Sequence, residues 1–273
     1  MTDIRQTLQY AKYLRQIGWE VERLSETNYF IKKVPLLGSV LKLQRPEELR
    51  YNDIKLLSAK HKAFQIIVEP KAELDAKFLK SVGYKLCRSP YLPTKTLQLD
   101  LTKSENIILV NLKKDARYLV RKTKNNKCKE IENIEEFRNA WKKSVGLKRY
   151  VPPLSHLLAL KKSFGKNSLF ISAGLPAEAL AQAGAIFLIG DRIAYYWQAF
   201  TNKEGRKVSA QYQIVWQGIL WAKKLGAKVF DFEGTYDKRF PNKSWKGFTH
   251  FKKSFGGHEV YYPGTFTKIK VPL

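Results

Sequence analysis

A strand–helix–strand pattern between residues 193 and 234 constrains the fold of this chain more than any other feature. The side chains of residues 193–200 alternate between two faces, which is the period of a β-strand. Apolar residues then recur every three or four positions between 212 and 220, which predicts an amphipathic helix that ends near Gly226. Residues 229–234 form a second apolar run and predict a second strand. Such a βαβ unit predicts an α/β (α+β) fold with its polar site at the carboxyl edge of a sheet.

Two carboxylates lie in the second predicted strand. Asp231 and Glu233 are two residues apart, so both side chains are expected on the same face of that strand. Carboxylates at such an edge can accept or relay a proton, and they can equally stabilise the end of the strand. Both interpretations are compatible with the sequence.

A turn-rich connector divides the chain into two parts. Residues 89–93 read Ser-Pro-Tyr-Leu-Pro, a composition that interrupts regular structure. We therefore predict an N-terminal domain over residues 1–93 and a C-terminal domain over residues 94–273, each able to bury a core. The pattern before the connector predicts helix 4–19, strands 28–33 and 39–44, helix 47–62, strand 63–69 and helix 73–82. After the connector it predicts strand 95–101, helices 111–129, 135–145 and 155–164, and a meander of strands 168–174, 179–189 and 192–200.

The net charge is the strongest compositional signal. Fifty Lys and Arg residues against 24 Asp and Glu residues give a formal charge of +26. Such an excess favours a polyanionic partner, which would be nucleic acid, a membrane surface or a phosphorylated substrate. A generally basic proteome is the alternative explanation.

The most basic stretch is the helix predicted over residues 111–129. An apolar face remains in this stretch, so we expect a docked helix with a charged outer side. That side is either a solvated surface or a contact with a nucleic-acid backbone, and the charge of the whole chain favours the nucleic acid. The candidate nucleic-acid-binding residues are Lys113, Lys114, Arg117, Arg121, Lys122 and Lys124.

Common catalytic and metal motifs do not occur in the sequence. It contains no Gly-x-Ser-x-Gly, His-Glu-x-x-His, Walker A or Gly-x-Gly-x-x-Gly motif. The histidines are scattered, and Cys87 and Cys128 lack a metal-ligand spacing, so we expect no metal, no cofactor and two reduced thiols in a cytoplasmic protein. The polar N-terminus does not resemble a signal peptide, and no run approaches the ~18 apolar residues of a membrane span.

Several short motifs, taken in order, resemble the FemABX-type peptidoglycan-bridge aminoacyltransferases. They are Pro35-Leu-Leu-Gly38 between two strands and followed by Arg45-Pro46, Thr96-Leu-Gln-Leu-Asp-Leu-Thr102, Trp221-Ala-Lys-Lys-Leu-Gly226, Asp231-Phe-Glu-Gly234, and Phe251-Lys-Lys253 before Phe255-Gly-Gly257. The resemblance covers nearly the whole chain and implies two GNAT-like acyltransferase domains side by side, each a mixed sheet flanked by helices. Between Lys129 and Trp141 there is no long heptad insertion, so we expect no coiled-coil arm.

The resemblance also implies roles for individual residues. It marks Lys252, beside Phe251, most clearly, as a cation that holds phosphate or stabilises negative charge in the transition state. With Asp231 and Glu233 it forms the candidate catalytic set, although a surface lysine before a glycine turn is the alternative. The candidate substrate-binding residues are Phe251, Tyr195 and Trp197 along the channel, Arg149 and Tyr150 in the loop 146–153, and Arg45 and Arg206 for phosphate. For Tyr195 and Trp197, burial in the core is the alternative.

The implied reaction is transfer of an amino acid from aminoacyl-tRNA to the amine of a peptidoglycan-precursor peptide, which is nucleotide-linked or lipid-linked. Residues 205–210 read Gly-Arg-Lys-Val-Ser-Ala and lack the glycines with which GNAT enzymes bind acetyl-CoA pyrophosphate, which favours a different acyl donor. The alternatives are an acyl-CoA-dependent N-acyltransferase on the same scaffold and a non-catalytic RNA-binding module. We expect a monomer in the cytoplasm, with possible peripheral contact at the inner face of the membrane.

Overall fold

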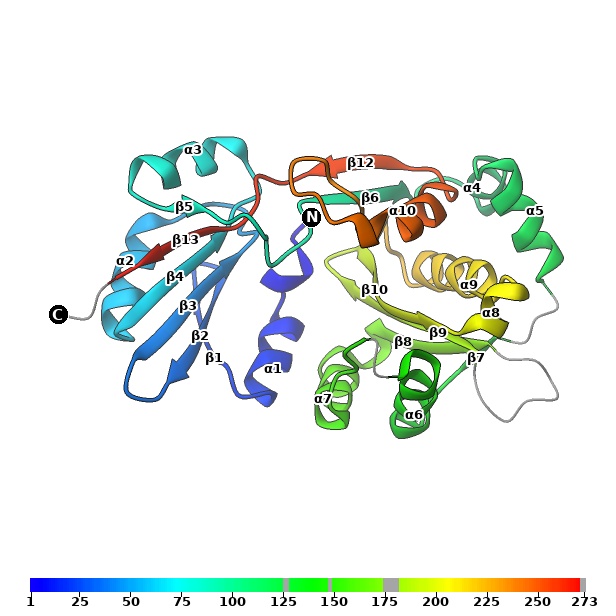
Figure 1. Ribbon diagram of the computed structural model, residues 1–273, viewed down its shortest axis with the longest axis horizontal. Coiled ribbons are helices and arrows are strands. Elements are labelled where there is room, and N and C mark those ends of the chain that lie inside the picture. The colour runs from blue at the N-terminus through cyan, green and yellow to red at the C-terminus, as the bar shows by residue number, and fades with distance from the viewer. Residues whose placement is uncertain (125–127, 147–148, 174–181, 271–273) are drawn as a thin grey trace.

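Two mixed β-sheets flanked by helices lie side by side in the protein (Figure 1). The computed structural model describes residues 1–124, 128–146, 149–173 and 182–270. Within these ranges no helix combines the length and apolar character needed to cross a membrane. The predicted fold class, α/β with two mixed sheets and flanking helices, is confirmed.

The first sheet has six strands in the order β1-β2-β3-β4-β13-β5. Helices α2 and α3 bury their apolar sides against it, and the short strand β13 from the end of the chain lies between β4 and β5. One strand of the predicted C-terminal domain therefore completes the sheet of the N-terminal half. The elements are β1 (Glu20–Leu24), β2 (Thr27–Val34), β3 (Gly38–Gln44), α2 (Tyr51–Lys60), β4 (Ala63–Glu69), α3 (Glu73–Ser81), β5 (Lys85–Leu86) and β13 (Phe266–Ile269).

The second sheet has seven strands in the order β12-β6-β11-β10-β9-β8-β7. Its strands are β6 (Lys95–Asp100), β7 (Cys128–Glu130), β8 (Ser168–Ala173), β9 (Ala183–Gly190), β10 (Ile193–Thr201), β11 (Val229–Gly234) and β12 (His258–Tyr261). Its helices are α4 (Glu105–Val110), α5 (Lys114–Lys122), α6 (Ile134–Val145), α7 (Leu154–Phe164), α8 (Lys203–Lys207), α9 (Ala210–Lys224) and α10 (Lys246–Lys253).

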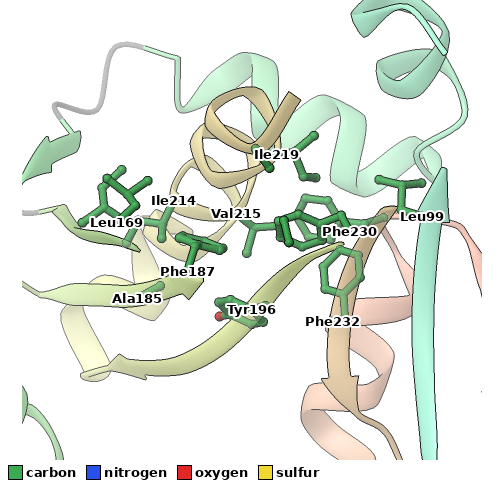
Figure 2. Packing of buried hydrophobic residues seen from close by; sticks show 14 of the residues in the cluster. Leu99, Leu169, Ala185, Phe187, Tyr196, Ile214, Val215, Ile219, Phe230 and Phe232 are labelled. Atoms are coloured by element: carbon green, nitrogen blue, oxygen red, sulfur yellow. The ribbon is translucent and has the colours of Figure 1, made fainter. Parts of the chain in front are cut away.

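Helix α9 packs closely on one face of the second sheet. Its residues Ile214, Val215 and Ile219 are fully buried against aromatic side chains of the sheet (Figure 2). A Cβ atom at Gly218 would lie 2.4 Å from the Phe187 ring, so glycine is required for the helix to approach this closely.

The other face of the second sheet joins the two halves of the molecule. Helix α1 (Leu8–Gln16) is near the start of the chain, yet Tyr10 and Leu14 pack in one core with Trp141 of α6 and Leu160 of α7. A short 3-10 turn, η1 (Ile4–Gln6), precedes α1 and is also buried. The N-terminal segment therefore belongs to the core beneath the second sheet.

The predicted strand–helix–strand unit is confirmed, because β10 and β11 are parallel neighbours joined through α9. The helix predicted over residues 111–129 is wrong in its extent: α5 starts at Lys114 and residues 128–130 form β7. The backbone N–H of Lys113 donates to the Ser254 carbonyl oxygen at 2.9 Å, a long-range contact that delays the helix start. Residue 174 and residues 179–181, at the ends of two predicted strands, lie outside the described residues.

Candidate active site

Strands β10 and β11 stop pairing halfway along their length. Their parallel register covers Ile193 with Val229, Ala194 with Phe230, and Tyr195 with Asp231, and a β-bulge follows between Tyr196 and Gln198. Beyond these pairs a pocket of about 580 Å³ opens between the two strand ends. A pocket at the carboxyl ends of parallel strands is the usual place for a site in an α/β sheet.

The pocket walls come from both strands and from helices α8, α9 and α10. A Cβ atom at Gly234 would lie 2.5 Å from the Trp245 ring, so glycine lets this ring cover the end of β11. The lining residues are Pro93, Arg149, Tyr196, Trp197, Gln198, Ala199, Phe200, Thr201, Gly205, Arg206, Ser209, Gln211, Tyr212, Glu233, Gly234, Trp245, Gly247, Phe248, Phe251 and Lys252.

Lys252 places a buried cation in this pocket. Its side chain is largely enclosed, and its Nζ donates to the Gly234 carbonyl oxygen at 2.6 Å. The Nζ also lies 5.0 Å from the centre of the Phe248 ring and 5.8 Å from that of Tyr196. Burial lowers the pKa of Lys252 to about 8, although Glu233 and Asp231 act in the opposite direction. An ammonium has three donors, so two remain for a bound molecule.

Glu233 lines the pocket beside Lys252 and is held from below by the N-terminal turn. The Glu233 Oε1 lies 3.1 Å from the Nη2 of Arg5, whose guanidinium is buried. Arg5 Nη1 also pairs with Asp3 at 3.1 Å. Glu233 has a φ of +57°, a left-handed conformation that is rare for a residue with a long side chain. These contacts fix the Glu233 carboxylate at the place where β10 and β11 separate.

Asp231 lies one layer deeper and supports Glu233 instead of lining the pocket. Its Oδ1 accepts the backbone N–H of Glu233 at 2.6 Å, and its Oδ2 accepts from Gln98 Nε2 at 2.9 Å. Burial, together with the neighbouring charge of Glu233, raises the pKa of Asp231 to about 6. The two carboxylates thus occupy different environments, although their spacing in the sequence predicted that both would lie on the same face of the strand.

Arg45 was expected to contact phosphate, and the structure gives it a different environment. It is 1% exposed, its Nη1 pairs with Asp3 at 3.1 Å, and its Nη2 donates to the Pro93 carbonyl oxygen at 2.7 Å. Its guanidinium also stacks over the Tyr262 ring at 3.7 Å. With Arg5 it encloses Asp3, so Arg45 connects the two halves of the molecule and is not accessible to a substrate.

The aromatic residues of β10 are divided between the pocket and the core. Tyr195 is buried beneath the sheet, where its hydroxyl accepts the backbone N–H of Ile4 at 3.1 Å, so its expected place along the channel is corrected. Trp197 packs on the same side as Tyr195, edge-on to the Tyr10 ring at 6.1 Å and beneath the Arg5 guanidinium, and it also lines the pocket. Tyr196 takes the position on the pocket side, and its hydroxyl accepts from Gln211 Nε2 at 2.6 Å.

The remaining predicted residues are distributed around the pocket. Phe251 lines it and meets the Tyr212 ring edge-on at 4.9 Å. Arg149 and Arg206 also line it, and Arg206 Nη1 donates to the Thr201 carbonyl oxygen at 3.1 Å. Tyr150 is 75% exposed and stands outside the pocket lining.

The predicted nucleic-acid-binding residues lie on and beside α5, at the far side of the second sheet from α1 (Figure 1). Ala116 and Val120 bury the apolar side of α5, which leaves most of its lysines and arginines outward. Arg117 is partly buried and donates to the Val110 carbonyl oxygen at 2.7 Å. The predicted amphipathic character of this segment is confirmed, while its role stays a prediction.

One cluster of possible metal ligands lies in the described residues, away from the pocket. The ligand atoms of Glu20, Glu22 and His61 are within 4.8 Å of one another. Lys60 Nζ lies 2.6 Å from Glu22 Oε1 and Lys33 Nζ lies 3.4 Å from Glu20 Oε2, so both carboxylates already have cationic partners.

Sequence reasoning missed Arg5, Asp3, Tyr196, Trp245 and Phe248. Tyr196 could have been found, because alternation placed it opposite Tyr195 on the same strand. Arg5 had no local signal, since its partner Glu233 is 228 residues away.

Comparisons with known proteins agree with this geometry. Residues 159–273, which contain the pocket-forming strands and Lys252, match the model of the FemAB family. The C-terminal part of the chain is FemAB-like. A comparison with curated protein sequences found no match.

Solved structures extend the similarity over the whole fold. The crystal structure of FemX has a TM-score of 0.81 at 16% identity, covering 98% of this chain and 92% of that chain. The C-terminal domain (DUF2156) of a putative lysylphosphatidylglycerol synthetase from Agrobacterium fabrum has a TM-score of 0.64 at 10% identity, with 98% and 89% covered. A tandem GNAT protein from the clavulanic acid biosynthesis pathway has a TM-score of 0.59 at 10% identity, with 94% and 85% covered. The predicted FemABX-type resemblance with a GNAT-like fold is confirmed.

Proposed function

We propose that this protein is an aminoacyltransferase that moves an amino acid from aminoacyl-tRNA to the amine of a peptidoglycan-precursor peptide. The observation that carries the proposal is the buried Lys252 ammonium beside the Glu233 carboxylate, at the splayed strand ends of a FemAB-like segment. At family level, the FemAB match and the FemX-like fold support a peptidoglycan-bridge aminoacyltransferase.

The reaction needs a base for the incoming amine and a cation for the developing oxyanion. The acceptor amine attacks the ester carbonyl carbon, a C–N bond forms, and negative charge collects on the carbonyl oxygen. In our proposal Lys252 donates a hydrogen bond to that oxygen while Gly234 anchors its Nζ. The ester C–O bond then breaks, and the ribose oxygen leaves as a hydroxyl with the proton that Glu233 has taken from the amine.

Glu233 is placed to handle the proton of the amine. Its Oε1 is occupied by Arg5, so the other carboxylate oxygen is the one offered to a substrate. That oxygen would orient the amine and accept its proton as the C–N bond forms. Asp231 holds the Glu233 backbone and acts in this scheme as a positioning residue.

The shape of the pocket suits an aminoacylated nucleotide end. Aromatic side chains, among them Trp197, Phe248 and Phe251, form walls on which a base or an amino-acid side chain can pack. Arg149 and Arg206 are at the lining, where they would meet phosphate oxygens. The exposed cations on and beside α5 would contact the tRNA backbone further out.

The remaining partners in this proposal follow from the acceptor. A muropeptide on a nucleotide or on a lipid carrier supplies the amine, and a lipid-linked acceptor would bring the protein to the inner face of the membrane. In this proposal the enzyme acts as a cytoplasmic monomer, with each chain carrying a complete pocket.

The deciding experiment is a transfer assay with the purified protein. A mixture of tRNAs charged with labelled amino acids is incubated with a muropeptide acceptor, and product is followed by mass spectrometry. Labelled peptide should form with charged tRNA and not with acyl-CoA or with the Lys252→Met variant. Product from acyl-CoA alone would replace the donor with a thioester. Tight tRNA binding without product from any donor would favour the RNA-binding module.

A further inference from the structure

The turn between β2 and β3 exposes two consecutive leucines. Leu36 is 106% exposed and Leu37 is 55% exposed, relative to the reference accessibility of leucine. The turn is at the far end of the first sheet from α10 (Figure 1). Isolated apolar residues are common on protein surfaces, but two at the tip of a hairpin form a projecting apolar point.

The backbone of this turn gives no reason for leucine at position 36. Leu36 has a φ of +65°, in the left-handed region that glycine or asparagine adopts more readily. Two residues later Gly38 occupies the position where glycine is needed, because a Cβ atom there would lie 2.2 Å from the Lys62 carbonyl oxygen. Leu36 therefore has an unfavourable backbone conformation as well as an exposed side chain, so its selection points to something outside the fold.

Lysines surround this apolar point. The Lys33 side chain is 80% exposed beside the hairpin, and Lys62 follows α2, where its carbonyl oxygen accepts the Ser39 N–H at 3.2 Å. The end of β13 is at the same end of the sheet, with Ile269 70% exposed and Lys270 exposed. Glu20 and Glu22 lie nearby and pair with Lys33 at 3.4 Å and Lys60 at 2.6 Å, so the net positive charge beside the leucines comes from Lys62 and Lys270.

We propose that this end of the first sheet docks on the surface of an anionic lipid bilayer. We name it the leucine tip and define it as Leu36, Leu37, Lys33, Lys62 and Lys270. The leucines would enter the boundary between headgroups and acyl chains, and the lysines would remain level with the lipid phosphates.

The dimensions of the leucine tip favour a lipid surface over other occupants. A specific protein interface buries roughly 800 Å² on each partner, far more than two leucines at a hairpin tip supply. A nucleic acid would be recognised by cations with aromatic stacking residues, and aliphatic leucines offer no stacking surface. A fluid bilayer needs no matching shape, so a small apolar point ringed by cations is sufficient.

Sedimentation with lipid vesicles tests this proposal without any transferase substrate. The full-length protein is mixed with vesicles of phosphatidylglycerol and phosphatidylcholine, and separately with pure phosphatidylcholine. The double variant Leu36→Ser with Leu37→Ser keeps the charge of the protein, so it separates insertion from general attraction. We expect binding to the anionic vesicles that falls about tenfold or more in this variant.

A matched control is available on another surface of the same domain. Leu74 is 77% exposed in the first turn of α3, so Leu74→Ser removes a comparable exposed leucine outside the leucine tip. This variant should bind vesicles like the natural protein. The proposal is overturned if the natural protein ignores anionic vesicles, or if the double variant binds them as well as the Leu74→Ser variant does. Because neither tRNA nor acceptor is present, failure here leaves the transferase proposal standing, and the reverse also holds.

Discussion

Two parallel strand pairs, one in each sheet, occupy corresponding places and end differently. In the first sheet β3 and β4 stay paired from Ser39 and Ala63 to Gln44 and Glu69. In the second sheet β10 and β11 pair at three positions and then separate around the pocket. The same topology therefore gives a closed end in one half of the molecule and an open one in the other.

The closing residues explain the difference. Gln44 Nε2 donates to Glu69 Oε2 at 2.6 Å, and Glu69 Oε1 accepts from Leu92 N and Thr265 Oγ1 at 2.8 and 2.6 Å. The carboxylate of the first sheet is thus occupied on both oxygens. In the second sheet Glu233 has Arg5 on one oxygen and a pocket beside it. The first sheet therefore ends in a fully hydrogen-bonded carboxylate, and the second ends in a carboxylate that lines a pocket.

The largest expected effect comes from removing Lys252, the cation in the pocket between β10 and β11. Lys252→Met should lower kcat/KM of the transfer reaction by about 10²–10³-fold, because one donor to the oxyanion is lost. The control is Lys253→Met, which removes the neighbouring lysine whose side chain is 42% exposed and pairs with Glu259. Equal rates for the two variants would contradict the role proposed for Lys252.

A pair of carboxylate deletions tests the comparison itself. Glu233→Ala should reduce kcat by about 10²-fold through loss of a general base. Glu69→Ala should instead leave three donors without their acceptor and lower the free energy of unfolding by about 1–3 kcal/mol. Steady-state kinetics and urea unfolding of both variants give the answer. If Glu69→Ala loses as much activity per folded molecule as Glu233→Ala does, the assignment of a structural role to Glu69 and a catalytic role to Glu233 is wrong.

The pH dependence of the transfer rate should also come from groups at the ends of β10 and β11. The rate should fall above a pH of about 8, where Lys252 loses its proton, and below about 6, where Asp231 gains one. Asp231→Asn should remove the acidic limb and keep the alkaline one. A pH–rate profile of kcat/KM for both proteins measures this, and an unchanged acidic limb would assign it to another group.

The same two groups affect stability in opposite pH windows. The folded protein binds the Asp231 proton more tightly than the unfolded chain does, so this contribution is present at low pH and is lost as pH rises through about 6. Lys252 binds its proton less tightly when folded, so its unfavourable contribution is relieved as pH rises above about 8. Thermal unfolding across pH should show the first change in the natural protein and not in Asp231→Asn.

The smallest effect is expected at the surface of α5. Neutralising Lys114 and Arg121 together, by substitution to Gln, should reduce the slope of log affinity for tRNA against log salt by about 1–2. Lys77→Gln with Lys80→Gln on α3 makes the same charge change in the other half and should leave the slope unchanged. Equal slopes for both double variants would remove α5 from the proposed tRNA contact.

Much of the second sheet could be predicted from local pattern. The strand predicted over residues 229–234 coincides with β11, and the helix predicted to end near Gly226 corresponds to α9. Alternation identified β10 but assigned Ala199 and Phe200 to the wrong faces, because a β-bulge shifts the register between Tyr196 and Gln198. A bulge has no strong sequence signal in this strand, so the faces of Ala199 and Phe200 could be placed only by the structure.

The candidate site was predictable in part. Lys252, Glu233 and Phe251 were found from the sequence and do line one pocket. Arg45 was expected there as well, because a cation after a strand has the same local appearance whether it faces a substrate or pairs with Asp3 in the core. Burial and partner are properties of the folded chain, and sequence spacing does not contain them.

The sequence by itself determined the longer helices and strands, the βαβ unit, the basic surface and the FemABX-type motifs. These features depend on side-chain period and composition over a few turns of backbone. The tertiary structure alone decided that β10 and β11 open while β3 and β4 stay closed, and that Arg5 reaches Glu233 from the other end of the chain. Those outcomes depend on packing and charge pairing between segments up to 228 residues apart, which local preferences along the chain do not specify.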